Sequence, residues 1–350
     1  MNYTIDKQLF RAVVDTGSPF ILVDGTCDTP EARTLWGCYR GVGRPSGLAP
    51  TDELFGGIDV GTEWRRGTFI VGAGVRPSPV GWLTADLAQI ASVEDAIFGV
   101  VRSAVDKGGG AVFLGLAKGR LPRIRPTFLE QTSVTAMRFN FIERTLALSS
   151  RPLIPRTEEA VRIIDLRPRG APIATYAARL SRLVVNNQEI VLDRPTVVII
   201  DTGCTGASIC DELYDLEVLP TVWQDARIEI ATEQGNLCAV EASVRRRRRS
   251  APGIPPPRVG TDAPEFDEFP LIITPVHVPW FDPGFGEEEC EDEHPQCRVG
   301  PISRRKSLLA SWLARSDGLG DKPYVIFIGL AFLWQRELTI DIDSGRMRIV

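Results

Sequence analysis

The same short pattern occurs once in each half of the chain, and it limits the folds that the chain can adopt. Residues 13–18 read VVDTGS and residues 199–204 read IIDTGC, so each apolar run ends in Asp-Thr-Gly. Two apolar residues and a glycine follow further along, at 113–115 in the first half and at 327–329 in the second. Such an internal repeat predicts two similar units, in each of which a buried strand leads into a tight loop.

Short runs rich in Val, Ile, Leu and Phe alternate with Gly and Pro, which favours a mainly β fold. The 350 residues, 43% of them hydrophobic, suffice for two domains or one large bilobal fold with buried cores. The net charge of −5 at pH 7 argues against a general nucleic-acid binder. No apolar run reaches the length of a transmembrane helix.

Three segments are expected to be helical: 126–134, 207–214 and 307–315. Residues 180–192 indicate a β-hairpin, because the Asn-Asn pair at its centre tolerates the left-handed backbone of a tight turn.

Two further segments differ in composition from the rest: 244–264 is basic and then Pro-rich, and 285–297 is acidic. We expect solvated loops there. The alternatives are that the two segments attract each other, or that the arginine run at 245–249 is a processing site.

The two repeated aspartates, Asp15 and Asp201, are the candidate catalytic residues. Hydrolysis of a peptide bond by water needs a base that takes a proton from the water and an acid that protonates the carbonyl oxygen. Two carboxyl groups about 3 Å apart can share one proton and supply both, with no metal ion or cofactor. The alternative is that both aspartates only form turns. His277 and His294 lie in no hydrolase motif.

The residues next to each aspartate are expected to support this arrangement. Gly17 and Gly203 allow a sharp turn and a close approach of substrate. The hydroxyls of Thr16 and Thr202 are expected to form hydrogen bonds to the facing loop, which would fix the separation of the two aspartates.

At these residues the sequence resembles the pepsin family of aspartic proteases, over nearly the whole chain. VVDTGSP and VIIDTGCT resemble the two active-site loops, LVVNNQEI resembles the hairpin before the second loop, and AVFLGLAKG and the stretch from VIFIGL to MRIV resemble later segments. The family implies a bilobal acid-protease fold, with two β-barrel-like lobes, a substrate cleft between them and a flap hairpin over the cleft.

The resemblance divides the chain into two lobes. We expect an N-terminal lobe at 1–155, with the first DTG loop and the flap. We expect a C-terminal lobe at 156–350, with the second DTG loop and the variable loops 244–264 and 285–297.

The resemblance also implies an aspartic endopeptidase that acts on peptide or protein substrates as a monomer, in a secreted, vesicular or lysosome-like compartment. No signal peptide is visible and few residues precede Asp15, so we expect upstream sequence to be missing. The alternative function is a pepsin-like binding or inhibitor module with little or no catalysis. An unrelated all-β protein with DTG turns would instead hold Asp15 and Asp201 far apart.

The flap departs from the family pattern. Its best match is Val60-Gly61-Thr62, which lacks the family's flap tyrosine. The tryptophan that usually partners this tyrosine is replaced by Leu22. Both members of a polar pair are therefore absent together, which predicts altered substrate subsites.

The second loop also departs from the pattern, because Cys204 stands where the family usually has Thr or Ser. In the first loop, Ser18 can donate a hydrogen bond to Asp15. A thiol is a weak donor, so Asp201 should lose support on that side, which Thr205 would partly restore.

Four of the seven cysteines form two pairs that are close in sequence, Cys27 with Cys38 and Cys290 with Cys297. Disulfides at these pairs would fit an oxidising compartment, and the first falls where many pepsin-family members carry a small disulfide loop. Reduced cysteines are the alternative, because sequence does not fix connectivity. No CxxC pair occurs, which disfavours a zinc site.

Overall fold

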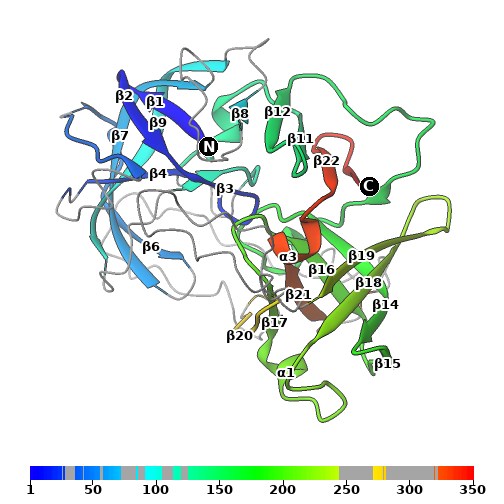
Figure 1. Cartoon of the computed structure of the whole chain (residues 1–350). Helices are drawn as coiled ribbons and strands as arrows, with labels where there is room; N and C mark the ends of the chain where they lie inside the picture. Colours follow the sequence, from blue (N-terminus) through cyan, green and yellow to red (C-terminus); the bar gives the residue numbers. More distant parts are fainter. Residues whose placement is uncertain are drawn as a thin grey trace, which may run out of the picture.

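The structure, a computed structural model, describes residues 1–25, 27, 36–41, 43–55, 58–71, 84–85, 91–104, 113–119, 125–243, 271–278, 280, 319 and 322–350. The described part is mainly β, as predicted, and its strands form sheets of nine, six and eight strands. The nine-stranded and eight-stranded sheets lie on opposite sides of the molecule (Figure 1).

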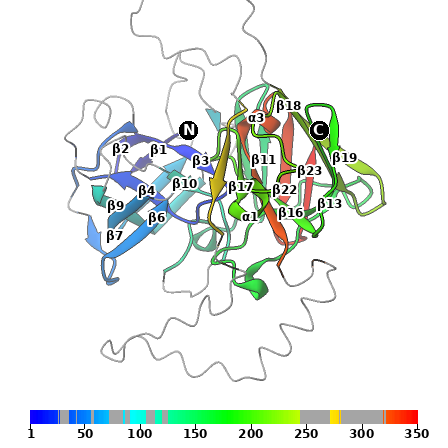
Figure 2. The same ribbon diagram turned by 90° about the horizontal axis from the view of Figure 1, so that it is seen from below.

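The nine-stranded sheet follows the order β2-β1-β7-β9-β4-β10-β3. The long antiparallel pair of β7 and β9 forms its centre, and β5 and β6 pair with β7 at its side. Figure 2 shows these blue and cyan strands together at one end of the molecule. The strands are β1 (Asn2–Ile5), β2 (Gln8–Arg11), β3 (Val13–Asp15), β4 (Ile21–Asp24), β5 (Arg44–Pro45), β6 (Thr51–Phe55), β7 (Ile58–Val71), β9 (Ala91–Ala104) and β10 (Phe113–Gly115).

The eight-stranded sheet follows the order β19-β18-β14-β16-β21-β17-β20, with β15 paired to β14. The predicted hairpin is confirmed, because Asn186 and Asn187 join β14 to β15 with φ values of 51° and 63°. The strands are β14 (Ala177–Val185), β15 (Gln188–Ile190), β16 (Thr196–Ile200), β17 (Ala207–Cys210), β18 (Asp225–Ala231), β19 (Leu237–Ser243), β20 (Ile273–Val276) and β21 (Tyr324–Ile328).

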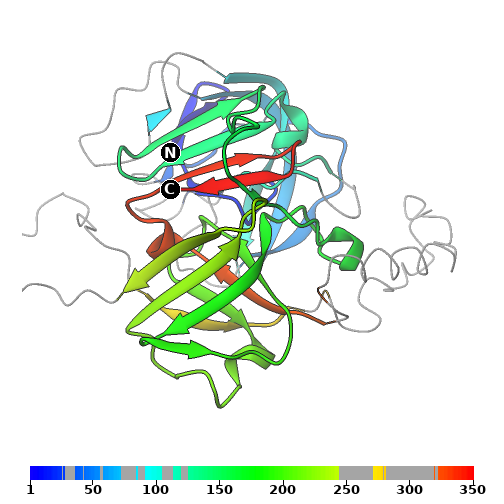
Figure 3. The same cartoon turned by 90° about the vertical axis from the view of Figure 1, so that its right-hand side faces the viewer.

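The six-stranded sheet combines strands from before and after residue 155, in the order β13-β23-β22-β11-β12-β8. β22 pairs antiparallel with β11, so that Asp341 lies opposite Ala136. Figure 3 shows the red strands β22 and β23 beside the green strands β11 and β12. The strands are β8 (Thr84–Ala85), β11 (Ala136–Asn140), β12 (Thr145–Ser149), β13 (Val161–Arg162), β22 (Glu337–Asp341) and β23 (Arg346–Ile349).

The nine-stranded and eight-stranded sheets contain the same four-strand arrangement. β3 pairs parallel with β10, β10 antiparallel with β4, and β4 parallel with β9. In the eight-stranded sheet β16, β21, β17 and β20 repeat these pairings in the same order and the same senses. The DTG tripeptide connects the first strand to the third in both sheets, so the repeat in sequence is also a repeat in structure.

Helices are short within the described residues. They are the 3-10 turns η2 (Leu129–Gln131) and η3 (Arg167–Arg169) and the helices α1 (Asp211–Tyr214) and α3 (Leu330–Leu333). None of the described helices is long and apolar enough to cross a membrane.

The helix predictions were only partly right. The segment 126–134 contains a single 3-10 turn. The prediction for 207–214 was wrong over its first half, because Ala207–Cys210 is a strand between β20 and β21, and only Asp211–Tyr214 is helical. The predicted helix at 307–315 lies outside the described residues, as do the loops 244–264 and 285–297.

A buried carboxylate fastens the six-stranded sheet to the chain that follows β12. Asp341, at the end of β22, accepts hydrogen bonds from the backbone N–H groups of Leu153 at 2.8 Å and Ile154 at 2.9 Å. Its side chain is buried, so these two donors satisfy a charge that has lost most of its contact with water.

Replacing Asp341 by Ala is expected to lower the free energy of unfolding by about 2–4 kcal/mol, because two backbone N–H groups lose a charged acceptor. Urea unfolding followed by circular dichroism measures the change. Asp343→Ala is the matched control, since its carboxylate is 58% exposed in the ion pair with Lys118 and should cost less than about 1 kcal/mol. Equal losses in the two variants would contradict the role given to Asp341.

Candidate active site

The two DTG loops begin where β3 and β16 end, and the neighbouring strand holds each of them in place. Asp15 is the last residue of β3, and its carbonyl accepts a hydrogen bond from Leu116 N at 2.7 Å. Asp201 follows β16, and its N–H donates to the carbonyl of Ile328 at 3.0 Å. Backbone hydrogen bonds thus hold both aspartates at the end of a parallel strand pair.

The glycine of each loop lies directly against the aspartate of the other loop. A Cβ atom at Gly17 would lie 2.7 Å from Asp201 Oδ2, and a Cβ atom at Gly203 would lie 2.5 Å from Asp15 Cγ. Any side chain at either position would collide with the facing carboxyl group. The glycines are therefore needed for this close approach, whereas the turn itself does not require glycine, since neither residue has a positive φ.

The expected hydrogen bonds between the loops are present and reciprocal. The Thr16 hydroxyl donates to Ile200 O at 2.8 Å, and the Thr202 hydroxyl donates to Val14 O at 2.6 Å. Each hydroxyl also accepts the backbone N–H of the other threonine, at 3.1 and 3.0 Å. These four bonds are buried, so they fix the separation of the two loops without competition from water.

The two aspartates interact with each other and with donors in their own loops. Asp15 accepts hydrogen bonds from Gly17 N, at 2.8 Å, and from the Ser18 hydroxyl. Gly203 N donates to Asp201 Oδ1 at 2.9 Å.

The environment of Asp201 changes its acidity. Burial raises the pKa of Asp201 well above its usual value, and the negative charge of Asp15 and a hydrogen bond with the Asp15 side chain raise it further. The backbone N–H groups of Gly203 and Cys204 oppose this increase. Asp201 therefore holds its proton at a pH at which an exposed aspartate has lost it.

Cys204 supports the second loop differently from Ser18 in the first. Its Sγ lies 3.8 Å from Ser208 Oγ, and its pKa is raised by burial and by the charge of Asp201, which keeps the thiol protonated. Thr205 was predicted to restore the lost support, but among the described residues its hydroxyl forms no hydrogen bond to Asp201. Thr205 is exposed, and its carbonyl accepts Ala331 N at 2.8 Å, while the Cys204 N–H supports Asp201 instead.

The residues predicted for the flap lie on one strand of a hairpin. β6 and β7 form this hairpin as an antiparallel pair in which Glu53 lies opposite Val60. Val60, Gly61 and Thr62 lie on β7, and the side chains of Val60 and Thr62 are buried.

Leu22, which replaces the tryptophan of the family pattern, is a packing residue. It is completely buried and belongs to a small apolar cluster with Phe20, Val60, Trp64 and Val101. This cluster fills the space between the hairpin and the strand that follows the first DTG loop. The position that would carry a polar contact in the family is therefore part of a hydrophobic core.

A polar network that we did not predict joins the base of the hairpin to a distant segment. Glu53 and Arg125 form an ion pair whose side chains are only 7% and 5% exposed. Thr51 Oγ1 donates to Glu53 Oε1 at 2.7 Å and accepts the Trp64 Nε1–H at 2.9 Å. The Arg125 guanidinium lies 5.0 Å from the Trp64 ring and 5.6 Å from the Phe20 ring. The hairpin is thus held by buried charge close to the first DTG loop.

A surface cavity of about 270 Å³ opens beside the same hairpin. Two of the predicted flap residues, Gly61 and Thr62, line it, together with Pro50, Thr51, Asp52, Glu63 and Arg102. Within the described ranges, no three His, Cys, Asp or Glu side chains gather closely enough to hold a metal ion.

Cys27 and Cys38 lie at disulfide distance, with their Cα atoms 5.3 Å apart. Cys204, Cys210 and Cys238 are not disulfide-bonded. The second predicted pair, Cys290 and Cys297, lies outside the described residues.

No protein-family model matches the chain, and no curated protein matches its sequence. The observations that carry the interpretation are the contact between each aspartate and the opposite loop, the reciprocal threonine bonds and the raised pKa of Asp201.

Replacing Asp201 by Asn is expected to change how stability depends on pH. Because the pKa of Asp201 is higher in the folded protein than in the unfolded chain, protonation of Asp201 favours the fold at acid pH, and this contribution is lost as the pH rises through the folded pKa. The variant cannot ionise, so its free energy of unfolding should exceed that of the wild type at neutral pH, and the difference should shrink towards acid pH.

Chemical unfolding at a series of pH values measures this difference. Asp343→Asn, which removes an exposed carboxylate, shows how much of any effect comes from the loss of surface charge. A difference between Asp201→Asn and the wild type that is constant with pH would argue against a raised pKa.

Replacing Glu53 by Ala is expected to cost about 3–5 kcal/mol of stability, because it leaves the Arg125 charge buried without this carboxylate. Glu63→Ala is the control, since Glu63 is 36% exposed beside Arg65 and should change stability by less than about 1 kcal/mol. The double variant Glu53→Gln/Arg125→Met should recover part of the loss in urea unfolding. No recovery, or equal losses at Glu53 and Glu63, would count against the buried pair.

Proposed function

We propose that this protein is an aspartic endopeptidase of the pepsin type, in which Asp15 and Asp201 activate a water molecule to hydrolyse peptide bonds. The observation that carries the proposal is that two aspartates from separate sheets meet in one site, each against the glycine of the other loop. In this proposal the nine-stranded and eight-stranded sheets are the centres of two lobes, and the six-stranded sheet joins them.

The proposed reaction uses one shared proton. The ionised carboxylate accepts a proton from water as the water oxygen attacks the carbonyl carbon, and the protonated carboxyl donates to the carbonyl oxygen. Return of a proton to the amide nitrogen then breaks the C–N bond. The raised pKa of Asp201 supports it as the proton donor, and the Gly17 and Ser18 hydrogen bonds, which Asp15 accepts, support Asp15 as the base.

The proposal includes the natural setting of the enzyme. Its substrates are peptides or proteins, and it acts as a monomer. The proximity of Cys27 and Cys38 supports an oxidising secreted, vesicular or lysosome-like compartment.

A second candidate is a binding or inhibitor module with the same fold, favoured by two departures at the site. Cys204 provides a weaker donor than a hydroxyl, and Leu22, in a buried apolar cluster, replaces one member of the family's polar flap pair. A peptide with a central hydroxyl that mimics the transition state separates the two functions. An active pair of aspartates should bind it much more tightly than the matching substrate peptide, and an inactive site should show no such preference.

Asp15→Asn and Asp201→Asn are each expected to lower kcat by about 10²–10⁴-fold or more, because each removes one partner of the acid–base pair. Digestion of an unfolded protein substrate over about pH 2–7 measures the activity, and Asp343→Asn should keep it. The endopeptidase proposal fails if the folded wild type cleaves nothing over this range, or if cleavage survives both aspartate substitutions.

A further inference from the structure

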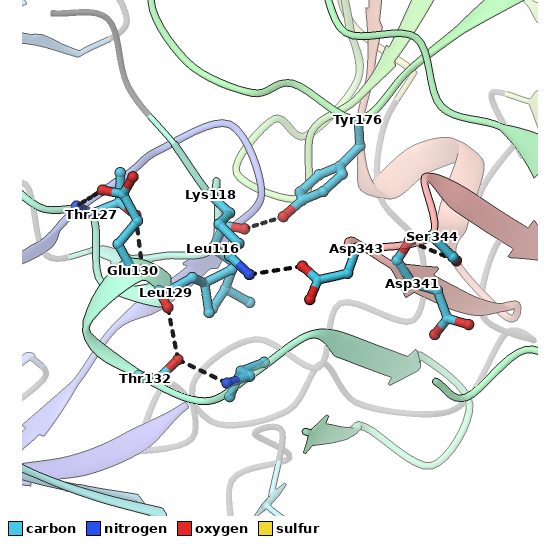
Figure 4. Close-up of polar contacts among 11 residues, drawn as sticks. Leu116, Lys118, Thr127, Leu129, Glu130, Thr132, Tyr176, Asp341, Asp343 and Ser344 are labelled. Atoms are coloured by element: carbon cyan, nitrogen blue, oxygen red, sulfur yellow. Dashed lines mark hydrogen bonds and ion pairs between the residues drawn. The ribbon is translucent and has the colours of Figure 1, made fainter. Parts of the chain in front are cut away.

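Residues 116–119, directly after β10, contact the second half of the chain at three points. The Tyr176 hydroxyl donates a hydrogen bond to the Leu116 carbonyl (Figure 4). Lys118 Nζ lies 2.8 Å from Asp343 Oδ1, also drawn in Figure 4. Ala174 N donates to Gly119 O at 3.0 Å. Of the three, the Tyr176 bond is buried, whereas the Lys118 pair is exposed to solvent.

Tyr176 lies between the two DTG loops in a chain of hydrogen bonds. Its carbonyl accepts Ile200 N at 3.0 Å, and Ile200 directly precedes Asp201. On the other side, Leu116 N donates to Asp15 O at 2.7 Å. The path from Asp15 to Leu116, Tyr176 and Ile200 therefore joins the backbones of the two loops, and all four residues are buried.

This path meets the threonine bonds at Ile200, whose carbonyl accepts the Thr16 hydroxyl at 2.8 Å. The threonine bonds join residues 14–16 to residues 200–202, and the Tyr176 hydroxyl adds a further buried contact, to Leu116 beside Asp15. This added contact opposes a rotation of one loop against the other. Burial raises the pKa of Tyr176, so its hydroxyl keeps its proton and remains a donor over the whole acid and neutral range.

We propose that Tyr176 is a positioning residue that holds the Asp15 and Asp201 carboxyl groups at the distance needed to share a proton. This inference rests on the proposed function and deepens it. Tyr176 touches no substrate in this role and acts only through the backbones of the two loops. Since a displacement of about 1 Å can cost a catalytic site about 10²-fold, even a partial loosening should be measurable.

Tyr176→Phe tests the proposal, because it removes the hydroxyl and keeps the ring that packs in the core. We expect kcat to fall by about 10-fold, with KM changed by less than about 2-fold, since geometry at the reacting atoms is affected and substrate contacts are not. The alkaline limb of the kcat profile should move to lower pH, because carboxyl groups that part and admit water hold the shared proton less tightly.

Tyr324→Phe is the matched control. Tyr324 is also buried, and its hydroxyl donates to Asp193 Oδ1 at 2.9 Å, outside the path between the loops. This variant should lose comparable stability and keep the wild-type kcat and pH profile. The proposal is overturned if Tyr176→Phe keeps the wild-type kcat and pH profile, or if kcat and the pH profile change equally in the two variants.

A titration of the aspartate carboxyl carbons by NMR provides a readout that does not depend on activity. In the wild type one of the two apparent pKa values of the pair should be raised, and in Tyr176→Phe it should fall towards an ordinary aspartate value. If the pKa falls in Tyr176→Phe but the wild type cleaves no peptide, the endopeptidase proposal fails and the role of Tyr176 is supported. An unchanged titration in Tyr176→Phe would refute the role of Tyr176, whatever the activity.

Discussion

The structure depends on the cost of holding two carboxyl groups close together in a partly buried site. Burial and mutual repulsion both disfavour the doubly ionised pair, as the raised pKa of Asp201 reflects. Hydrogen bonds offset this cost: the reciprocal bonds of the two threonines and the backbone N–H groups of Gly17 and Gly203. The raised pKa of Asp201 offsets it further, because a protonated carboxyl group carries no charge. The parallel strand pairs β3–β10 and β16–β21 serve as rigid supports for these contacts.

The two halves solve the same packing problem with the same backbone and different side chains. A Cβ atom at Gly115 would lie 2.4 Å from Phe20 N, and one at Gly329 would lie 2.0 Å from Cys204 O, so each loop folds directly against a glycine of its own sheet. Ser18 and Cys204 occupy corresponding places with different donor strengths. The backbones of the two loops are therefore alike, but the two aspartates have different hydrogen-bond donors beside them. In the proposed mechanism this difference allows one aspartate to act as the acid and the other as the base.

Local chemistry explains what could be predicted from the sequence. The Asn186-Asn187 hairpin and the strand–loop repeats depend on neighbouring residues, and both are present. Ala207–Cys210 was predicted as helix because its strand partners are distant in sequence. The Glu53–Arg125 and Tyr176–Leu116 contacts join residues that only the complete fold brings together.

The pairing of β22 with β11 has a consequence for how the protein reaches its folded state. Residues 337–341 must arrive before the sheet around 136–140 can close, and nearly the whole second half of the chain lies between these strands. Contacts between such distant segments form slowly, because closing the long loop between them has a large entropic cost. Closure of the six-stranded sheet is therefore a late event during biosynthesis, and shorter nascent chains leave one hydrogen-bonding edge of β11 without its partner.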